Sequence, residues 1–457
     1  MARGLPPGAH LRARRWDVLV LGSALPGLAA AVRMGMAGLR VLIAEEDTAA
    51  RTPDLLREPF FLPGGPVLDG CLRALGVPLI ERRSLEARDL SYQVLLPDAR
   101  VDVGGVPLTA EELVAWGLAK PDAAASLLRG LAEAGRAEGQ ILLEGGWIRR
   151  SAIRRTRMGG AGAAARGLPI DFPAAEGDLA RFFDVQARVL ASQPAAELTP
   201  EARARVLGGA LAGGARFDAP DQTIRALLRR RLEALHGEIR TLGCPFGLVE
   251  LGDAPGLARV GPDDAWLGRA MLLNAPGHRL AHALRSWRQD VPKPVTGEAP
   301  THRRLAVHYV GLREAVPEPL ADRAICWDGG DDAPIEIAQL PSGRGRRFVE
   351  LVLAREVPFD ADDEREAARM AAAVAEFVPD DARRAKRAPL APRPLWDDEA
   401  ARGPRTPGIG WPEPVDPRTP GRSAVYRIPR DGFASLGAEG ELLLGWRIGD
   451  AIRDALA

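Results

Sequence analysis

The sequence predicts a mixed α/β fold in which a parallel sheet and an antiparallel sheet come from different parts of the chain. The first observation is residues 17–46, which follow the order strand, helix, strand that is typical of a parallel sheet. The second is residues 305–354, where short apolar runs of strand length follow one another and a Gly- and Arg-rich turn joins the last two. We therefore expect two structural parts in this chain of 457 residues.

The strand–helix–strand unit has the layout of a dinucleotide-binding unit. Its parts in chain order are a strand at 18–21, a glycine-containing turn at 22–27, a helix at 28–36 and a second strand at 41–44. The first strand is a continuous apolar run, as expected of a buried parallel strand, and Gly38 ends the helix. Glu45 follows about twenty positions after the turn, where such units carry the acid that accepts hydrogen bonds from ribose hydroxyls.

Each residue type in the turn has a physical role in binding a dinucleotide. Gly22 allows the tight turn out of the strand, and Gly27 allows the helix to pack closely on it. The N-terminus of the helix offers free N–H groups and a partial positive charge to phosphates. The cofactor-binding residues predicted in this unit are Gly22, Ser23, Ala24, Leu25, Gly27, Glu45 and Glu46. The alternative is an ordinary strand–helix–strand crossover that binds no ligand.

Further elements follow along the chain. Thr109 and Glu112 have the spacing of a capping box at the start of a long helix. The other predicted elements are helices at 68–75, 109–143 and 364–377, a last helix from about Glu439, and strands at 92–96, 100–103, 305–310, 324–327, 335–340, 348–354 and 425–428. Residues 158–167 and 397–422 are predicted to be loops because Gly, Ala, Arg or Pro dominate them.

The composition excludes several classes of protein. With 61 basic and 61 acidic residues the formal net charge is zero, which argues against nucleic-acid binding. Cys71, Cys244 and Cys326 are too far apart for a disulfide framework or a metal knuckle, so we expect a reducing cytoplasm. We expect no transmembrane segment, because no apolar stretch reaches the roughly 20 residues that a membrane helix needs.

The chain resembles a known superfamily over nearly its whole length. Its layout is similar to that of the flavin-dependent phytoene desaturase and amine oxidase superfamily, and more to the phytoene desaturase branch with its carotenoid and retinoid oxidoreductases. Besides the N-terminal unit, the resemblance rests on residues 222–242, 244–250, 270–284 and 425–457. It implies a Rossmann-like FAD-binding domain built from the discontinuous segments 1–75, 206–285 and 421–457, and a substrate domain with helices at 76–205 and an antiparallel sheet and helix at 286–420.

The resemblance also implies FAD as the cofactor and adds residues to its site. Phe246 falls where the superfamily contacts the adenine, and Arg430 and Asp431 follow the C-terminal strand within reach of the cofactor. Gly437 and Gly440 leave room at the mouth of the last helix, whose N-terminus points at the flavin in the superfamily.

The implied activity is that of an FAD-dependent oxidoreductase that desaturates, saturates or isomerises a hydrophobic small molecule, such as a polyene or isoprenoid. Hydride or electrons would pass to or from the flavin, and the protein would supply orientation and exclude water. No catalytic side chain is predicted, and the electron acceptor or donor is left open. A large hydrophobic substrate also implies transient contact with a membrane surface.

Departures from the superfamily pattern keep a second hypothesis open. Glycines of the pattern are missing at Ala24 and in residues 47–51 and 219–222, and Pro429 replaces a glycine beside the cofactor. The alternative is a non-catalytic relative that acts as a binding or assembly protein, with FAD absent or structural. A dehydrogenase that uses only NAD is a further alternative. His278 and His282 have the spacing of metal ligands, but we predict no metal site because no third ligand is evident.

Overall fold

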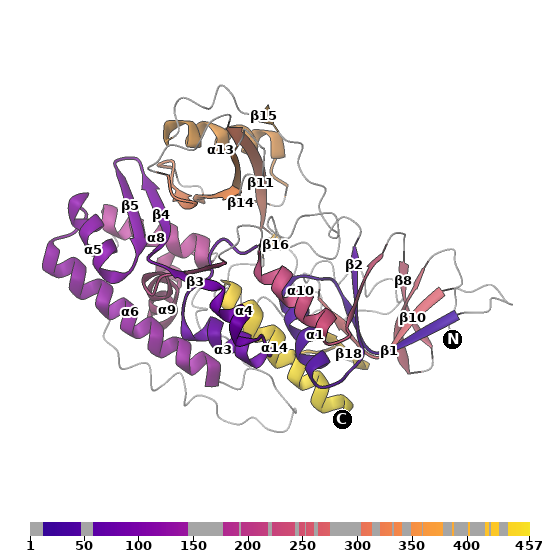
Figure 1. Ribbon diagram of the computed structural model, residues 1–457. Helices are drawn as coiled ribbons and strands as arrows, with labels where there is room; N and C mark the ends of the chain where they lie inside the picture. The colour runs from indigo at the N-terminus through magenta and orange to yellow at the C-terminus, as the bar shows by residue number, and fades with distance from the viewer. Residues whose placement is uncertain are drawn as a thin grey trace.

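The structure is a computed structural model, and it describes most of the chain. The described residues are 12–46, 58–144, 177–191, 193–217, 222–242, 246–251, 253–259, 264–274, 303–312, 320–330, 333–340, 349–358, 360–377, 386–387, 401–402, 416–419, 422–428 and 437–457. Figure 1 shows a sheet with helices at the right, a second sheet with α13 (Asp363–Phe377) at the top, and a group of helices at the left. The predicted mixed α/β fold with a parallel and an antiparallel sheet is confirmed.

Segments that are far apart in the chain assemble the parallel sheet. Its central strand β1 (Arg12–Leu21) runs parallel to both of its neighbours, β2 (Val41–Glu46) and β10 (Asp264–Leu273). The apolar run that predicted this strand is fully buried from Val18 to Leu21. The order across the sheet is β17 (Arg418–Thr419), β18 (Arg422–Arg427), β10, β1, β2 and β7 (Glu238–Leu242).

A hairpin extends this sheet beside β10. Its strands are β8 (Phe246–Leu251) and β9 (Ala254–Arg259), and β9 pairs antiparallel with β10. Strand β9 and the residues 264–269 of β10 belong to no predicted strand. These strands carry glycines, such as Gly256 and Gly268, that weaken the apolar pattern from which strands are predicted.

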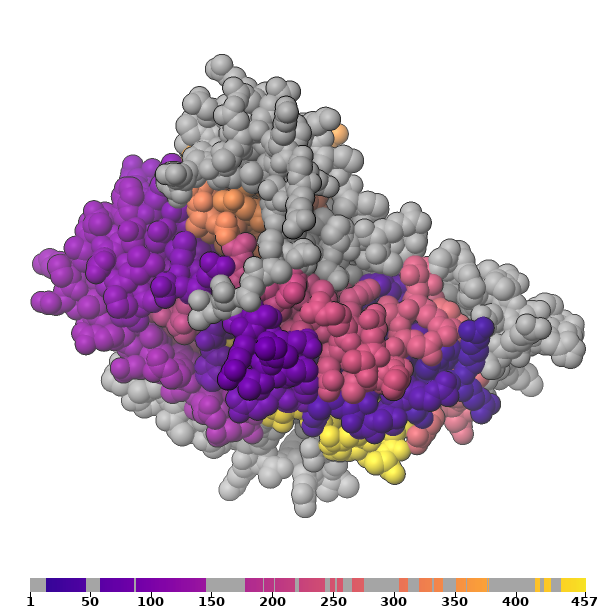
Figure 2. Space-filling view, in the orientation of Figure 1, coloured from indigo at the N-terminus to yellow at the C-terminus, as the bar shows by residue number. Residues whose placement is uncertain are grey.

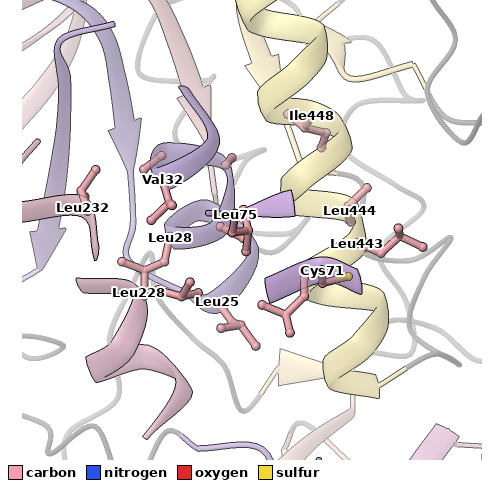
Figure 3. Packing of buried hydrophobic residues seen from close by; sticks show 14 of the residues in the cluster. Leu25, Leu28, Val32, Cys71, Leu75, Leu228, Leu232, Leu443, Leu444 and Ile448 are labelled. Atoms are coloured by element: carbon pink, nitrogen blue, oxygen red, sulfur yellow. The ribbon is translucent and has the colours of Figure 1, made fainter. Parts of the chain in front are cut away.

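Helix α1 (Leu25–Met36) lies at the centre of the largest hydrophobic core. It packs between α10 (Ile224–Ala234) and α14 (Gly437–Leu456), and Figure 3 shows Leu28 and Val32 of α1 between leucines of these two helices. A Cβ at Gly445 would lie 2.3 Å from the Pro26 carbonyl oxygen, and one at Gly449 would lie 2.8 Å from Arg33 Cβ. These glycines therefore let α14 approach α1 closely, and the order of the contacts shows that the two helices run parallel.

The second sheet combines two stretches of the chain. Its order is β15 (Lys386–Arg387), β11 (Arg303–Leu312), β14 (Val349–Pro358), β13 (Ile335–Leu340), β12 (Arg323–Cys326), β4 (Leu90–Leu96) and β5 (Ala99–Gly104), with β16 (Ala401–Arg402) also paired to β11. Strands β12 and β4 pair in parallel and the other pairs are antiparallel. Helix α13 covers this sheet through Met370 and Val374, which share a core with Leu353.

A group of helices lies at the left and in the lower centre of Figure 1. Its members are α3 (Pro66–Ala74), α4 (Leu79–Arg83), α5 (Val106–Ala115), α6 (Pro121–Glu144), α8 (Asp178–Ala191), the short 3₁₀ helix Ala195–Glu197 and α9 (Pro200–Leu211). Helices α6 and α9 are in close contact, because a Cβ at Gly208 would lie 2.1 Å from the Leu131 carbonyl oxygen. A small sheet of β3 (Leu85–Arg88) and β6 (Gly214–Phe217) joins this group to the rest.

The prediction of one long helix over 109–143 is wrong. The chain forms α5 and α6 instead, because Gly117 adopts a φ of +71° and Pro121 cannot continue a preceding helix. The capping box is wrong as well. Thr109 lies inside α5, where its Oγ1 accepts a hydrogen bond from the Gly104 N–H at 2.9 Å, and the N-cap residue is Gly105.

Some sequence-based predictions fall outside the described residues. They concern the loop at 158–167 and most of that at 397–422, the segment 47–51, and His278, His282, Pro429, Arg430 and Asp431. Among the helices that the structure describes, none is long and apolar enough to cross a membrane.

Candidate nucleotide-binding site

The turn between β1 and α1 has a fixed backbone. Gly22 adopts a φ of +98°, which favours glycine, and its N–H donates to the Ala44 carbonyl of β2 at 2.9 Å. The Asn274 amide, directly after β10, donates from Nδ2 to the carbonyls of Gly22 at 3.1 Å and Ala24 at 3.0 Å. The turn is thus held from both neighbouring strands at the carboxyl edge of the parallel sheet.

Gly27 and Ala24 differ in whether their positions require glycine. A Cβ at Gly27 would lie 2.0 Å from Asn274 Nδ2, so glycine is needed there for the packing of α1 on the end of β10. Ala24 has a φ of −58° and a ψ of 155°, a conformation open to any residue. The missing glycine at Ala24 therefore causes no backbone strain.

The N-terminus of α1 has the charge and the capping that suit the binding of an anion. Leu25 and Pro26 start the helix, the N-cap residue Ala24 makes no side-chain capping bond, and the first turn carries no acidic residue. A helix of this length has a partial positive charge at that end. This end lies at the turn that Gly22 begins, as the dinucleotide pattern predicts.

Glu45 is bound to groups of the protein itself. It lies at the end of β2, is only 2% exposed, and accepts a hydrogen bond from the Ser23 hydroxyl. Arg229 of α10 binds both of its carboxylate oxygens, with Nη2 at 2.5 Å from Oε2 and Nη1 at 3.2 Å from Oε1. Glu46, the last residue of β2, pairs in register with Leu242 of β7.

A second arginine of α10 reaches the same turn. Arg225 is completely buried, and its Nη2 donates to the Ser23 carbonyl at 2.7 Å. Arg225 and Arg229 are one helical turn apart and so lie on the same face of α10. Figure 2 shows the segment that contains α10 and β7, in pink, lying directly against the indigo N-terminal segment.

Sequence reasoning missed both arginines. The run from Arg225 to Arg231 contains several arginines, and nothing in it distinguishes those that face the turn from those that face solvent. The only local signal is that Arg225 stands among the apolar positions of α10, which a surface arginine would avoid.

The N-terminus of α14 lies at the same edge of the sheet as that of α1. Because Gly445 meets Pro26 in a parallel pair of helices, α14 extends beyond the start of α1 by about 10 Å at 1.5 Å per residue. Gly437 opens α14 with a φ of +54°, and a Cβ there would lie 3.2 Å from the Leu190 carbonyl oxygen of α8. Gly440, one turn later, is buried.

A buried carboxylate occupies the first turn of α14. Glu439 lies 3.5 Å from Arg205 of α9, measured from Oε2 to Nη1. Burial raises the pKa of the Glu439 carboxyl to about 7, although the charge of Arg205 and a backbone hydrogen bond from Leu68 oppose the rise. Glu439 thus titrates near neutral pH at the mouth of this helix.

For three predicted site residues the structure adds no evidence of cofactor binding. Phe246 begins β8, in the hairpin beside β10, and β7 rather than β8 is the strand that pairs with β2. Arg430 and Asp431 lie between the described segments 422–428 and 437–457. In the described part of the chain no group of three His, Cys, Asp or Glu side chains could hold a metal ion.

A pocket of about 490 Å³ lies near this turn. Its wall includes Gln222 and Glu58, and the Glu58 carboxylate accepts a hydrogen bond from the Ile224 N–H at 2.9 Å, at the start of α10. The next residue of α10 is Arg225, which binds Ser23. One turn of α10 therefore connects the pocket to the candidate nucleotide site.

Comparison with known proteins identifies the fold. Neither a family profile nor a curated protein sequence matches the chain. An oxidoreductase from Methanosarcina mazei has a TM-score of 0.57 at 14% identity, over 95% of this chain and 100% of that one. A double mutant of putrescine oxidase has a TM-score of 0.56 at 13% identity, over 96% and 99%. Cyclohexylamine oxidase from Brevibacterium oxydans has a TM-score of 0.52 at 12% identity, over 96% and 99%.

The chain therefore shares its overall fold with these oxidoreductases, putrescine oxidase and cyclohexylamine oxidase among them. This agrees with the amine oxidase side of the superfamily resemblance at the level of fold. Assignment to the phytoene desaturase branch stays a prediction.

Proposed function

We propose that this protein is an FAD-dependent oxidoreductase. The observation that carries the proposal is the shared edge of the parallel sheet, where the Gly22 turn, the open N-terminus of α1 and the N-terminus of α14 all lie. The fold that the chain shares with amine oxidases supports it. The domain division inferred from the sequence goes with this proposal, with the FAD-binding domain at 1–75, 206–285 and 421–457.

The residues at this edge fit an FAD molecule. The backbone from Gly22 to Leu25 and the N-terminus of α1 would hold its pyrophosphate, and Glu45 would hold the ribose of its adenosine. Asn274 Oδ1 is buried and has no hydrogen-bond partner among the described residues, so it offers an acceptor beside the same turn. The side chain at Ala24 is no obstacle, because its backbone conformation is an ordinary one.

When bound, FAD would supply the transfer of a hydride or an electron pair to or from the substrate. The chain's own residues would bind and orient the cofactor and the substrate, and would exclude water from them. The partial positive charge at the start of α14 favours a negative charge on the group in front of it, and Arg205 compensates the carboxylate of Glu439 there. The substrate that we propose is a small molecule with a large hydrophobic part, as in polyenes and isoprenoids, with an electron partner of unknown identity and a cytoplasmic location.

One observation favours the alternative of a binding or assembly protein. Both carboxylate oxygens of Glu45 already bind Arg229, so a ribose must share this carboxylate with a guanidinium. If Arg229 prevents this, the chain keeps the fold without the cofactor.

Purification of the protein distinguishes the FAD-dependent oxidoreductase from the non-catalytic relative. We expect a yellow protein whose flavin absorbance bleaches with dithionite, and whose flavin content falls sharply in Gly22→Val, because valine is strained at a φ of +98°. Gly130→Val is the matched control, since nothing lies within 4 Å of a Cβ at that position of α6. Circular dichroism melts show whether each variant is folded. A colourless, folded wild-type protein that takes up no added FAD would refute the proposal.

A further inference from the structure

The pocket beside α10 combines an apolar wall with a cluster of arginines. It lies where β3, β4, β6 and β12 meet the chain at residues 58–62. Its volume of about 490 Å³ is in the range of small-molecule sites. The lining residues come from segments that are far apart in the chain, so no local sequence pattern predicts the pocket.

Aromatic rings form the apolar wall. The rings of Phe61 and Tyr92 meet edge to face with centroids 5.3 Å apart, and those of Phe60 and Tyr92 lie 6.0 Å apart. Tyr92 is buried, and its hydroxyl donates to Gln186 Oε1 at 2.8 Å, which fixes the ring. Phe217 also lines the pocket, and together these rings can cover a flat or chain-like apolar group.

Arg88, Arg216 and Arg323 line the same pocket. Burial is the main cause that lowers the pKa of Arg323 to about 10; the charges of Glu58 and Glu336 oppose the fall, and the positive charge of Arg216 adds to it. Burial also lowers the pKa of Arg216, with a contribution from the charge of Arg88. The guanidinium groups are therefore close enough to repel one another in a partly dehydrated space.

Nearby carboxylates offset part of this positive charge, but none of those on the pocket wall has a described hydrogen bond to Arg323. Asp322 forms an ion pair with Arg216, Glu58 caps the first turn of α10, and Asp89 is exposed. Arg323 has no hydrogen-bond partner for its guanidinium among the described residues. An anion in the pocket would supply hydrogen-bond acceptors to Arg323, since guanidinium groups bind carboxylates and phosphates through charge-assisted hydrogen bonds.

We propose that this pocket binds a small molecule in which an oxyanion, a carboxylate or a phosphate ester, is joined to an apolar body. The oxyanion lies at Arg323 and Arg216, and the apolar body lies on Phe61, Tyr92 and Phe217. The binding itself does not depend on flavin. That this ligand is the substrate does rest on the proposed function, and α10 connects the pocket to the turn where the cofactor would bind.

The test is isothermal titration of the full chain with four probes of one chain length: octanoate, octyl phosphate, octanol and octylamine. We expect octanoate or octyl phosphate to bind, and which of the two binds more tightly identifies the oxyanion. Octanol and octylamine should bind at least about tenfold more weakly, because they lack the charge-assisted hydrogen bonds. Equal affinity for octanol, or tighter binding of octylamine, would overturn the proposal.

Variants locate the site. Arg323→Gln should weaken octanoate or octyl phosphate by about tenfold or more. Arg129→Gln should leave it unchanged, because Arg129 is exposed on α6 and does not line the pocket; its described hydrogen bond is to the Ala125 carbonyl of its own helix. If Arg323→Gln does not fold, Arg216→Gln decides, since that side chain is 41% exposed and tolerates replacement more easily. Unchanged oxyanion affinity in the folded variant would refute the assignment.

Ligand binding in the pocket and flavin binding can be tested independently of each other. A yellow protein that binds neither anionic probe would support the flavin-dependent function and refute the anion-binding pocket. A colourless protein that binds an anionic probe, with the binding lost in Arg323→Gln, would support the anion-binding pocket and refute the flavin-dependent function.

Discussion

Two groups of arginines line neighbouring sites in this molecule, and they differ in what they bind. Arg225 and Arg229 of α10 bind a carbonyl and a carboxylate of the protein itself. Arg216 and Arg323 in the pocket lie in one another's field, and only Arg216 has a described ion-pair partner. The difference indicates that the first group is structural and fixes the nucleotide turn, whereas the second group is placed for a ligand.

The largest expected effect is that of Arg225→Ala. The substitution leaves the Ser23 carbonyl without its donor and opens a cavity in a completely buried position, so the free energy of unfolding should fall by about 3 kcal/mol. Urea unfolding followed by circular dichroism measures it. Arg230→Ala, an exposed position on the same helix, should change stability by less than about 0.5 kcal/mol. Similar effects at the two positions would mean that Arg225 does not fix the turn.

A smaller effect is expected from the Glu45–Arg229 pair. Arg229→Gln and Glu45→Gln should each destabilise the fold by about 2 kcal/mol, and the double variant should lose less than the sum, with a coupling of about 1 kcal/mol. Unfolding of the four proteins of this cycle gives the coupling. Additive losses would show that the two side chains do not form a pair in solution. If FAD must compete with Arg229, the Arg229→Gln variant should also bind FAD more tightly than the wild type does.

A third effect concerns the ion pair of Glu439 and Arg205. This pair is buried, but its atoms Oε2 and Nη1 are 3.5 Å apart, so the pair is looser than Glu45–Arg229. Burial raises the pKa of the folded Glu439 carboxyl from 4.5 to about 7, so between these values the folded protein holds more protons than the unfolded chain. The free energy of unfolding should therefore fall as pH rises through this window, by about 2 kcal/mol between pH 5 and pH 8. In Glu439→Gln this part of the pH dependence should disappear. A wild-type slope that the variant retains would assign it to other groups.

The sequence predicted the elements that depend on local signals. The apolar run at Val18, the glycine at Gly22 and the acid at Glu45 lie within one short segment, and the structure puts them in the expected strand, turn and strand end. The predicted strands at 335–340 and helix at 364–377 were found for the same reason, since alternation or helical periodicity is a property of neighbouring residues. That these residues bind FAD stays a prediction.

The arginines of both sites could not be predicted, because long-range contacts decide their roles. Nothing near Arg229 in the sequence indicates that its partner is Glu45, which lies 184 residues earlier. The pocket likewise joins Phe61, Tyr92, Arg216 and Arg323, and only the paired strands bring them together. The missed break between α5 and α6 is different in kind, since Gly117 and Pro121 were visible, but the apolar pattern runs on through them.

The close contact of α1 with α14 has a consequence for the synthesis of the protein. Gly445 and Gly449 place the last helix against the first one, and β1 and β2 pair with strands that lie more than 190 residues later in the chain. A ribosome that adds about 5–20 residues per second needs tens of seconds to reach α14 after it has made α1. During that time the face of α1 that packs on α14 has no native partner. We therefore expect the nascent chain to be a client of chaperones that bind apolar segments until its C-terminal helix emerges.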